Sequence, residues 1–487
     1  MAATGSNETS VTERGSERLG KGDLGLVDVI SQSIGFIGPA FSAAFFIPTI
    51  VGASVNGKGA GIASPVSIIV AMIGMAGIAW IISRYAARIH AAGSLYNYVT
   101  EAFGERVGFV GGWAYYGGMM ALTLAIGLAF GGFLHDTLFF NHDIDIAWYW
   151  LSIAFWVAAA LMMLRGVAIS TRVQLVLGLG SFLIILVFSI WVIFKVGGDG
   201  GLSTAPFNPS SSDQGWNGIF FGILYAVIMF IGFESSANLA EESTNPRKHL
   251  PLAIFGSCIA VGVFYVIVTY AQAVGFGLSV QAWLEAFPPL YALAADPNYG
   301  STGFGELIQW LVVIDIAAVG LGTATGSSRG IFALARDGRL PAVLAKMHPK
   351  YKTPYVASTF LAIVSIVLIA IVAWTNGLMS VGEMDPGQWF PMFNWLATFG
   401  GFMMVAVYIA ICVAAFKGMP GESSGLLALA GIVGGLVSIG AIYGVIVQYA
   451  DIPAYNRVWW IAVLWLVGGV IVMVILNQMG RLRNRTV

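Results

Sequence analysis

Long runs of apolar residues alternate with short polar connections along almost the whole chain. A helix that crosses a bilayer needs about 20 apolar residues, and twelve segments meet that requirement. We predict spans at approximately 26–52, 64–83, 107–134, 147–164, 173–196, 218–240, 250–277, 305–334, 355–374, 389–416, 425–449 and 458–478. The pattern lacks the alternating segments of about ten residues that build porin-type barrels. It therefore predicts an all-α integral membrane protein with one transmembrane domain over residues 25–478.

The two ends of the chain differ in composition from the domain between them. Residues 1–24 are polar and lack the apolar core and cleavage pattern of a signal peptide, so we expect a disordered tail. Residues 479–487 form a short basic tail. Neither tail has the length of a soluble output domain, so we do not expect a membrane sensor.

The composition agrees with a chain that is surrounded by lipid rather than by water. Apolar residues make up 58% of the sequence and charged residues only 10%, against roughly 25% in an ordinary soluble protein. These values exclude a soluble enzyme, a disordered protein and a nucleic-acid-binding protein. Cys258 and Cys412 lie inside spans, and the five histidines do not cluster. We therefore expect no metal site, no cofactor and no enzymatic activity.

The net charge of −1 conceals a strong asymmetry of the basic residues. When the amino-terminal tail is assigned to one side of the membrane, 20 of the 23 Lys and Arg residues fall on that side. The other side holds Lys58, Lys195 and Arg457. Because positive loop charge marks the cytoplasmic side, we expect a multi-pass protein of the cell membrane with both termini in the cytoplasm.

Two spans contain residues that interrupt a helix at mid-depth. The first span contains SIGFIGP at 33–39, and the sixth contains FIGFE at 230–234, so that Ile-Gly-Phe recurs 197 positions apart. Glycine weakens a helix and proline removes a backbone donor. The pattern predicts two broken spans at matching positions of an inverted-repeat transporter, with the substrate held between the breaks. The alternative is that both helices are continuous, since glycine is common in membrane helices.

Three motifs now indicate a family. Residues 232–251 read GFESSANLAEESTNPRKHLP, residues 90–113 read HAAGSLYNYVTEAFGERVGFVGGW, and residues 333–341 read ALARDGRLP. In this order, and together with twelve spans, they resemble the motifs of the amino acid–polyamine–organocation (APC) superfamily. The resemblance implies five plus five inverted spans, over about 25–197 and 215–417, and two additional helices over about 424–478.

The resemblance also implies where the substrate binds and what the protein does. In the family, spans 1 and 6 unwind at the membrane centre, backbone N–H groups of span 1 bind the substrate carboxylate, and carbonyl groups bind its ammonium group. The implied function is a secondary active transporter, monomeric or homodimeric, that imports amino acids by alternating access. Phe230 or Phe233 would cap the site. The implied binding residues are Ser33, Ile34, Gly35, Phe36, Gly38, Phe230, Ile231, Gly232, Phe233 and Glu234.

The sequence departs from the family pattern at two positions. Many amino acid permeases have a G-x-G-I run in span 1, whereas here the spacing is Gly-Phe-Ile-Gly and Pro39 follows Gly38. This difference weakens the expectation of a bound α-carboxylate and leaves polyamine or ethanolamine-like amines as alternative substrates. Proton-coupled members often carry a lysine midway along span 5, where this chain has Ser181.

We single out three acidic residues within predicted spans, where ionisable groups are costly and usually functional. Glu234, at the second break, titrates or senses the substrate, or else it accepts hydrogen bonds from free N–H groups of the broken helix. Asp315, in the eighth span, binds a substrate amine, titrates, or pairs with a polar neighbour. Asp28, near the start of the first span, is an interfacial residue or a gate partner.

The identity of the coupling ion stays open between a proton and sodium. Thr323, Thr325, Ser327 and Ser328 in the eighth span supply hydroxyl oxygens, and Ser181 leaves room in the fifth. Hard cations prefer such ligands. In the alternative, each hydroxyl bonds to a carbonyl of its own helix. The family resemblance favours a proton.

Charged residues of both signs lie where spans 6 and 8 leave the membrane on the cytoplasmic side. They either form an inner gate or lie in solvated loops, since surface ion pairs are weak. The residues are Glu241, Glu242, Arg247, Lys248, Arg336, Asp337 and Arg339.

Overall fold

A computed structural model describes residues 24–89, 94–165, 170–240, 243–286, 288–374, 389–419, 421–452 and 455–479. The predicted polar tail (1–24) and basic tail (479–487) lie outside these residues, apart from Leu24 and Met479. The described chain is helical, and its β-type pairing is a single bridge between Leu24 and Ser243. The prediction of an all-α protein is confirmed.

The described residues contain twelve helical segments that are long and apolar enough to cross a membrane, as the sequence predicts. Two of these segments are interrupted: α1 (Leu26–Ile37) continues as α2 (Pro39–Val51), and α8 (Gly215–Phe230) continues as the 3₁₀ helix η4 (Phe233–Leu239). The other ten are α3 (Ser64–Ala86), α5 (Glu105–His142), α6 (Trp148–Arg165), α7 (Ser170–Gly198), α9 (Pro246–Gly275), α12 (Thr302–Arg336), α13 (Tyr355–Trp374), α14 (Trp389–Ala415), α15 (Ser424–Tyr449) and α16 (Val458–Gln478).

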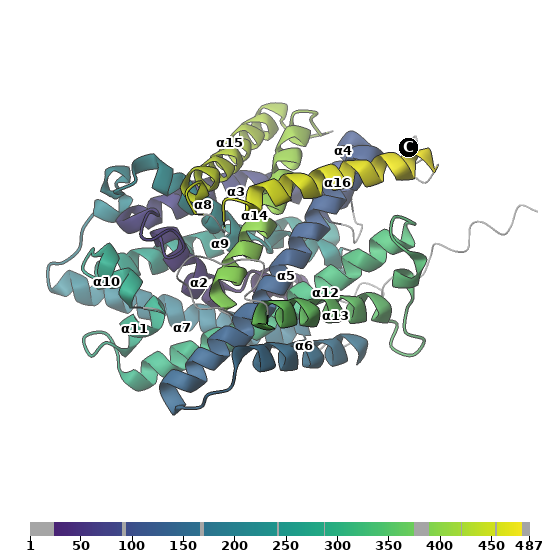
Figure 1. Cartoon of the computed structure of the whole chain (residues 1–487). Coiled ribbons are helices and arrows are strands. Elements are labelled where there is room, and N and C mark those ends of the chain that lie inside the picture. The colour runs from purple at the N-terminus through teal and green to yellow at the C-terminus, as the bar shows by residue number, and fades with distance from the viewer. Residues whose placement is uncertain are drawn as a thin grey trace, which may run out of the picture.

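Short helices lie in the connections between the spans. Figure 1 shows several of them between the longer membrane helices. These elements are α4 (Leu95–Phe103), α10 (Val280–Glu285), α11 (Pro289–Ala295), η1 (Gly61–Ala63), η2 (Ala205–Phe207), η3 (Pro209–Ser211) and η5 (Ala342–Ala345).

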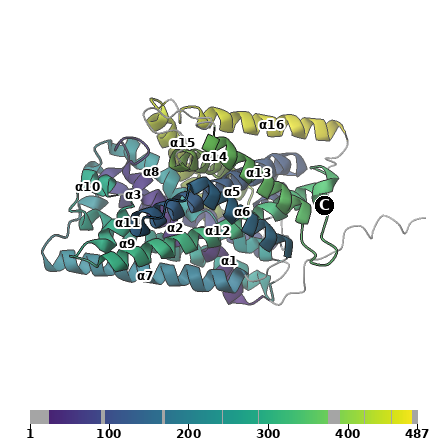
Figure 2. The same ribbon diagram turned by 60° about the horizontal axis from the view of Figure 1, so that its bottom comes forward.

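The interrupted spans lie at the centre of the bundle and the last two spans at its periphery. In the most apolar window of each interrupted span, 94% of the residues are buried inside the protein, whereas the figure for α16 is 17%. Figure 2 shows α16 along one edge and α7 along the opposite edge, with α2, α5 and α12 between them. The exposed side chains of α16 are mostly large and apolar, as expected for a helix that faces lipid.

Glycines let the central helices approach one another closely. A Cβ atom at Gly127 would lie 2.2 Å from Nε1 of Trp156, and one at Gly330 would lie 2.1 Å from Cε1 of Tyr116. Such distances are below van der Waals contact. Small residues at these positions therefore serve helix packing, which in membranes depends on close van der Waals contact.

Candidate substrate site

The first span is broken at a single residue. Gly38, with φ 60° and ψ 70°, ends α1 and begins α2. A left-handed backbone conformation costs little for glycine, and Pro39 is well suited to the first position of the next helix because no N–H is needed there. The predicted break is therefore present, but Ser33 and Phe36 lie in regular helix rather than in an unwound stretch.

The sixth span is broken over two residues and then changes its helix type. After α8, Ile231 is extended (φ −55°, ψ 128°), Gly232 has φ 119°, and the chain continues as η4. A Cβ atom at Gly232 would lie 2.7 Å from Cδ1 of Phe36 and 2.9 Å from the backbone N of Ile37. Glycine is therefore required at position 232 both by its positive φ and by its close contact with Phe36 and Ile37. The same contact shows that the two breaks face one another.

Two hydroxyl groups join the breaks. Ser33 Oγ donates to the Phe233 carbonyl at 2.8 Å, and Ser235 Oγ donates to the Gln32 carbonyl at 3.1 Å. These bonds run in opposite directions between α1 and η4 and tie the two segments together.

Glu234 caps the break from which it projects. Its side chain is 1% exposed; Oε2 accepts the Gly232 N–H at 3.1 Å, and Tyr408 Oη donates to Oε1 at 3.5 Å. The structure therefore supports the structural reading of this residue, in which it satisfies an N–H group freed by the break. Its role as a titrating group stays a prediction.

Asp315 reaches the other break from α12. Its side chain is 1% exposed, and Oδ2 accepts the Phe41 N–H at 2.8 Å across a sequence separation of 274 residues. Three roles are considered for Asp315: binding a substrate amine, titrating, or pairing with a polar neighbour. The structure shows a polar neighbour, which is the amino terminus of α2. Oδ1 has no hydrogen-bond partner among the described residues.

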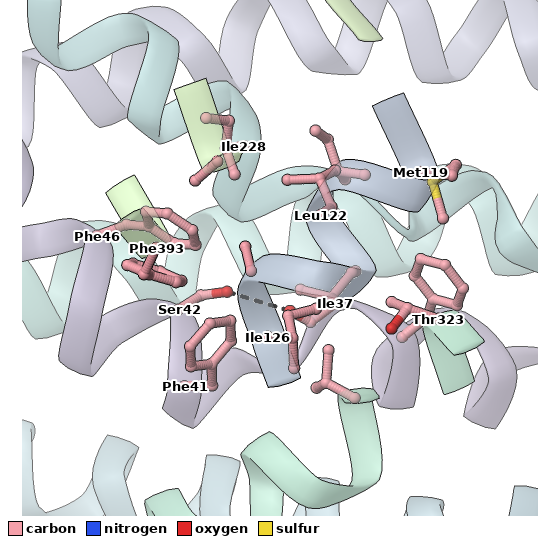
Figure 3. A pocket seen from close by; sticks show the side chains of 15 residues that line it. Ile37, Phe41, Ser42, Phe46, Met119, Leu122, Ile126, Ile228, Thr323 and Phe393 are labelled. Carbon is pink, nitrogen blue, oxygen red and sulfur yellow. Dashed lines mark hydrogen bonds between the residues drawn. The ribbon is translucent and has the colours of Figure 1, made fainter. Parts of the chain in front are cut away.

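A pocket lies against these breaks, between α1, α2, α5, α8, α12 and α14 (Figure 3). Its interior volume is ≈ 30 Å³, which is space for about two water molecules. Its wall is almost entirely hydrocarbon. The lining residues are Phe36, Ile37, Phe41, Ser42, Phe46, Met119, Leu122, Ala125, Ile126, Ile228, Ile231, Val319, Thr323, Phe393 and Ala397.

The aromatic residues at the pocket are not those that the resemblance implies. Phe230 packs edge-on against Tyr265, with ring centroids 5.8 Å apart, and Phe233 packs against Tyr408 at 6.2 Å; neither is among the described lining residues. The pocket rings instead come from α1, α2 and α14: Phe36, Phe41, Phe46 and Phe393.

A sequence profile of the family described as "Amino acid permease" matches residues 24–476. The chain belongs to this family. The permease is a member of the APC superfamily, as its motifs indicate, and the family consists of transporters rather than enzymes.

Curated relatives carry different substrates according to their names. The "Branched-chain amino acid permease BcaP" of Bacillus subtilis (strain 168) is 26% identical over 367 residues, covering 72% of the permease and 75% of the relative. The "Methylthioribose transporter" of the same organism is 28% identical over 320 residues (63% and 67%). The "Low-affinity putrescine importer PlaP" of Escherichia coli (strain K12) is 27% identical over 299 residues (58% and 61%).

Solved structures confirm the fold. The manganese transporter of Eremococcus coleocola, in complex with an aromatic bis-isothiourea compound, aligns with a TM-score of 0.54. The alignment covers 92% of the permease and 93% of that chain at 14% sequence identity. The permease therefore has the APC transporter fold.

The hydroxyl groups considered for sodium bind to neighbouring protein groups in the permease. Thr323 Oγ1 donates to the Gly320 carbonyl at 3.2 Å, and Ser181 Oγ donates to the Gly178 carbonyl at 3.0 Å. Ser327 Oγ is 2.9 Å from Thr123 Oγ1 of α5. Thr325 and Ser328 also bond to carbonyl groups of α12. Within the described residues, no three His, Cys, Asp or Glu side chains gather as a metal site.

An ion pair lies at the face of the bundle where α1 begins and α12 ends. Arg339 Nη2 is 3.0 Å from Glu105 Oε2, and its side chain is 7% exposed. The guanidinium carbon lies 4.9 Å from the centroid of the Tyr96 ring. Burial raises the pKa of Tyr96 to about 12, so the phenol stays neutral beside the cation.

The predicted gate residues are only partly brought together. Arg339 pairs with α5 rather than with the exit of span 6, and Glu241 and Glu242 lie outside the described residues. Asp28 Oδ2 accepts the Gly25 N–H at 3.0 Å. This contact caps the first turn of α1, which agrees with the interfacial reading of that residue.

Proposed function

We propose that this permease is a secondary active transporter that imports a small amine-bearing substrate with an apolar side chain by alternating access. The observation that supports the proposal is the apolar pocket at the two helix breaks, which lies among the central spans rather than at the surface. In transporters with broken helices, the substrate and the coupling ion bind near such breaks. The pocket is also walled on several sides, as alternating access requires.

Amino acids with branched or aromatic side chains are the first candidate substrates. The rings of Phe41, Phe46 and Phe393, together with Ile126 and Ile228, provide a hydrocarbon wall, which favours an apolar side chain by burial. The likeness to a branched-chain amino acid permease agrees with this class.

Amines that lack a carboxylate are the second candidate. This class is favoured by the contact between Asp315 and the backbone of span 1, whose N–H groups the resemblance assigns to the substrate carboxylate. Putrescine, named for one relative, is an amine of this kind.

Proton coupling is proposed over sodium coupling. The hydroxyl groups in spans 5 and 8 are already bonded to protein groups, whereas Glu234 and Asp315 are buried carboxylates at the two breaks. Tyr408, Tyr115 and Cys258 are the titratable groups close to Glu234. We further propose that both termini face the cytoplasm and that the protein lies in the cell membrane; the repeat boundaries and the oligomeric state stay predictions.

The function is tested by uptake into proteoliposomes that contain the purified chain. A panel of labelled amino acids and amines is offered under an imposed proton or sodium gradient. We expect accumulation of at least one apolar compound that depends on the proton gradient and on the presence of the protein. Failure of every compound to accumulate under either gradient would reject the proposal.

Proton coupling is tested by replacing Glu234 with glutamine. We expect the pH dependence of uptake to flatten, because the amide still accepts the Gly232 N–H but does not titrate. The matched control is Glu285→Gln in α10, where the carboxylate is exposed and the pH profile should not change. An unaltered profile for Glu234→Gln would leave this residue with its structural role alone.

A further inference from the structure

Buried aromatic rings cover the pocket on the side of the membrane opposite the start of α1, which we call the outer face. Phe45 of α2 contacts Phe133, Trp389 and Phe393, with ring centroids 5.1, 5.8 and 5.5 Å away. Phe133 and Trp389 lie nearer the outer ends of α5 and α14 than the lining residues of those helices do. Because the interior of ≈ 30 Å³ holds only about two water molecules, a larger molecule from the outer face enters only when this layer opens.

Four hydroxyl groups from different parts of the chain meet beside this layer. Tyr225 Oη of α8 is 2.8 Å from Thr398 Oγ1 of α14 and also hydrogen-bonds to Tyr449 Oη of α15. Tyr449 Oη is in turn 3.0 Å from Ser54 Oγ, in the connection that follows α2. The Tyr225 ring stacks on Phe46, with centroids 6.4 Å apart, and Phe46 lines the pocket. One ring therefore separates this hydroxyl chain from the pocket.

The donors of the hydroxyl chain all point in one direction. Thr398 Oγ1 donates its single hydrogen to the Asn394 carbonyl at 2.7 Å, so Tyr225 is the donor in its contact with Thr398. Tyr225 then accepts from Tyr449, and Tyr449 accepts from Ser54. Hydrogen bonds in such a chain polarise and strengthen one another. The loss of one hydroxyl group therefore weakens the contacts that remain.

The helix that completes the hydroxyl chain lies at the periphery of the bundle. In the most apolar window of α15, 28% of the residues are buried, compared with 94% in α8. Its backbone nevertheless meets α8 closely, since a Cβ atom at Gly444 would lie 2.1 Å from the carbonyl carbon of Phe220. Tyr449, the last residue of α15, is only 1% exposed. A side chain from a lipid-facing helix thus holds together the outer halves of both broken spans, α2 and α8.

We propose that Tyr449 is a positioning residue that controls how readily the pocket opens to the outer face. Opening towards that face requires Phe46 of α2 to separate from Phe393 of α14, whose ring centroids are 5.6 Å apart. The hydroxyl chain joins the same two elements through α8 and α15, so the chain breaks when they separate. Its strength therefore sets the population of the open state. The inference goes beyond the transport function proposed above, because it concerns the opening of the pocket and is tested without a substrate.

The reactivity of a cysteine in the pocket measures this opening. Ala397 lines the pocket from α14 and is 0% exposed, so Ala397→Cys reacts with a membrane-impermeant methanethiosulfonate only when the pocket is open. Lys58 lies exposed in the connection after α2, and Lys58→Cys reports whether the reagent reaches the outer face of a membrane vesicle. Both reporters are placed in the full-length chain, with the buried Cys258 and Cys412 replaced by alanine.

We expect Tyr449→Phe to raise the rate at which Ala397→Cys reacts from the outer face at least about fivefold, because fewer hydrogen bonds hold the closed state. Tyr225→Phe should act similarly, and the double variant should add little, since both substitutions break one chain. The matched control is Tyr443→Phe, also on α15, where the hydroxyl group donates to the exposed Asn217 at 3.4 Å. Its rate should stay within about twofold of the native rate.

Vesicles of the opposite orientation separate control of opening from general loosening. A larger population that is open to the outer face leaves less that is open to the inner face, so Tyr449→Phe should not raise the reactivity of Ala397→Cys from the inner face. A loosened protein would react faster from both faces, and this result would overturn the inference.

Other results would also overturn the inference. They are an unchanged rate in both Tyr449→Phe and Tyr225→Phe, an equal increase in Tyr443→Phe, and a pocket cysteine that reacts in no variant. Failure of the proposed function has a different signature. If the rates change as expected but no compound accumulates in proteoliposomes, the transport proposal fails while the control of opening by Tyr449 stands.

Discussion

The two helix breaks expose the same kind of backbone group at the centre of the membrane, yet a carboxylate reaches each break by a different route. At Gly38 the carboxylate is Asp315, which comes from α12 and is 274 residues distant from the N–H that it binds. At Gly232 it is Glu234, only two residues further along the chain. Unsatisfied backbone groups cost several kcal/mol in lipid, so both breaks need such a partner. The first break ties α2 to α12, whereas the second carries its own cap.

The backbone geometry accounts for this difference. The first break is one left-handed residue between two regular helices, and its free donors point along the axis of α2 towards a neighbouring span. The second break passes into a 3₁₀ helix, in which a side chain two residues after the glycine folds back onto its N–H. We therefore expect the first break to depend on packing between helices and the second on local conformation.

The largest expected effects follow from adding a methyl group at the glycines. Gly232→Ala should lower the free energy of unfolding by about 3 kcal/mol or more, because φ 119° is strained for alanine and the new Cβ would meet the backbone of Ile37. Gly38→Ala should cost about 2 kcal/mol, because a φ of 60° is less unfavourable and the close contact is with the Val319 side chain at 2.1 Å. Unfolding in mixed micelles with increasing SDS measures both.

A compensating substitution distinguishes the effect of Gly38→Ala from that of Gly232→Ala. Val319→Ala removes the side chain that a methyl group at Gly38 would meet, so the double variant Gly38→Ala/Val319→Ala should be more stable than the sum of the single effects predicts. Val319→Ala should not improve Gly232→Ala. Equal rescue of both glycine variants would show that the breaks do not differ in the way described.

The next effect concerns the carboxylates. Asp315→Ala should cost about 2 kcal/mol, because the buried Phe41 N–H loses its acceptor and α2 loses its tie to α12, and Glu234→Ala about 1 kcal/mol, because the Gly232 N–H loses only a local cap. The same unfolding measurement applies. As controls, Asp315→Asn and Glu234→Gln keep an acceptor and should retain most of the stability. A larger loss for Glu234→Ala than for Asp315→Ala would contradict the assignment of the long-range contact to the first break.

The sequence predicts the spans and the breaks well because both depend on local properties. Twelve apolar segments are visible as runs of sufficient length, and Gly38-Pro39 and Gly232 mark the interruptions by conformational preference alone. The contact between Asp315 and Phe41 is not visible, since it joins two spans whose relative rotation the sequence does not specify. For the same reason, Phe230 and Phe233 are natural choices beside a break although their rings pack elsewhere.

The residues that line the pocket also cannot be predicted from the sequence, for a physical reason. Almost every residue of a central span is apolar, so periodicity does not distinguish the face that meets a substrate from the face that meets another helix. Phe46 and Phe393 line the pocket, but the sequence around them offers no signal that other phenylalanines in α2 and α14 lack. A polar residue at matching depth, such as Ser42, is the nearest available indication.

A smaller effect is expected for the hydroxyl groups that join the breaks. Ser33→Ala and Ser235→Ala should each cost about 1 kcal/mol, because each removes one buried hydrogen bond. The two bonds cross the same contact between α1 and η4, so the effects should not be additive: a double-mutant cycle should give a coupling of about 0.5 kcal/mol or more. Strict additivity in unfolding experiments would mean that the breaks are not mechanically joined by this pair.

The smallest change in stability is expected for Tyr408→Phe. This variant tests whether the Glu234 cap is local or also depends on α14. Tyr408 Oη donates to Glu234 at 3.5 Å, the limit of a hydrogen bond, while its ring packs on Phe233. Tyr408→Phe keeps the ring and removes the hydroxyl, so we expect a loss of about 0.5 kcal/mol or less in the free energy of unfolding. A loss comparable to that of Asp315→Ala would mean that Glu234 is held in place from α14. Both breaks would then depend on long-range contacts, and the local character assigned to the second would not hold.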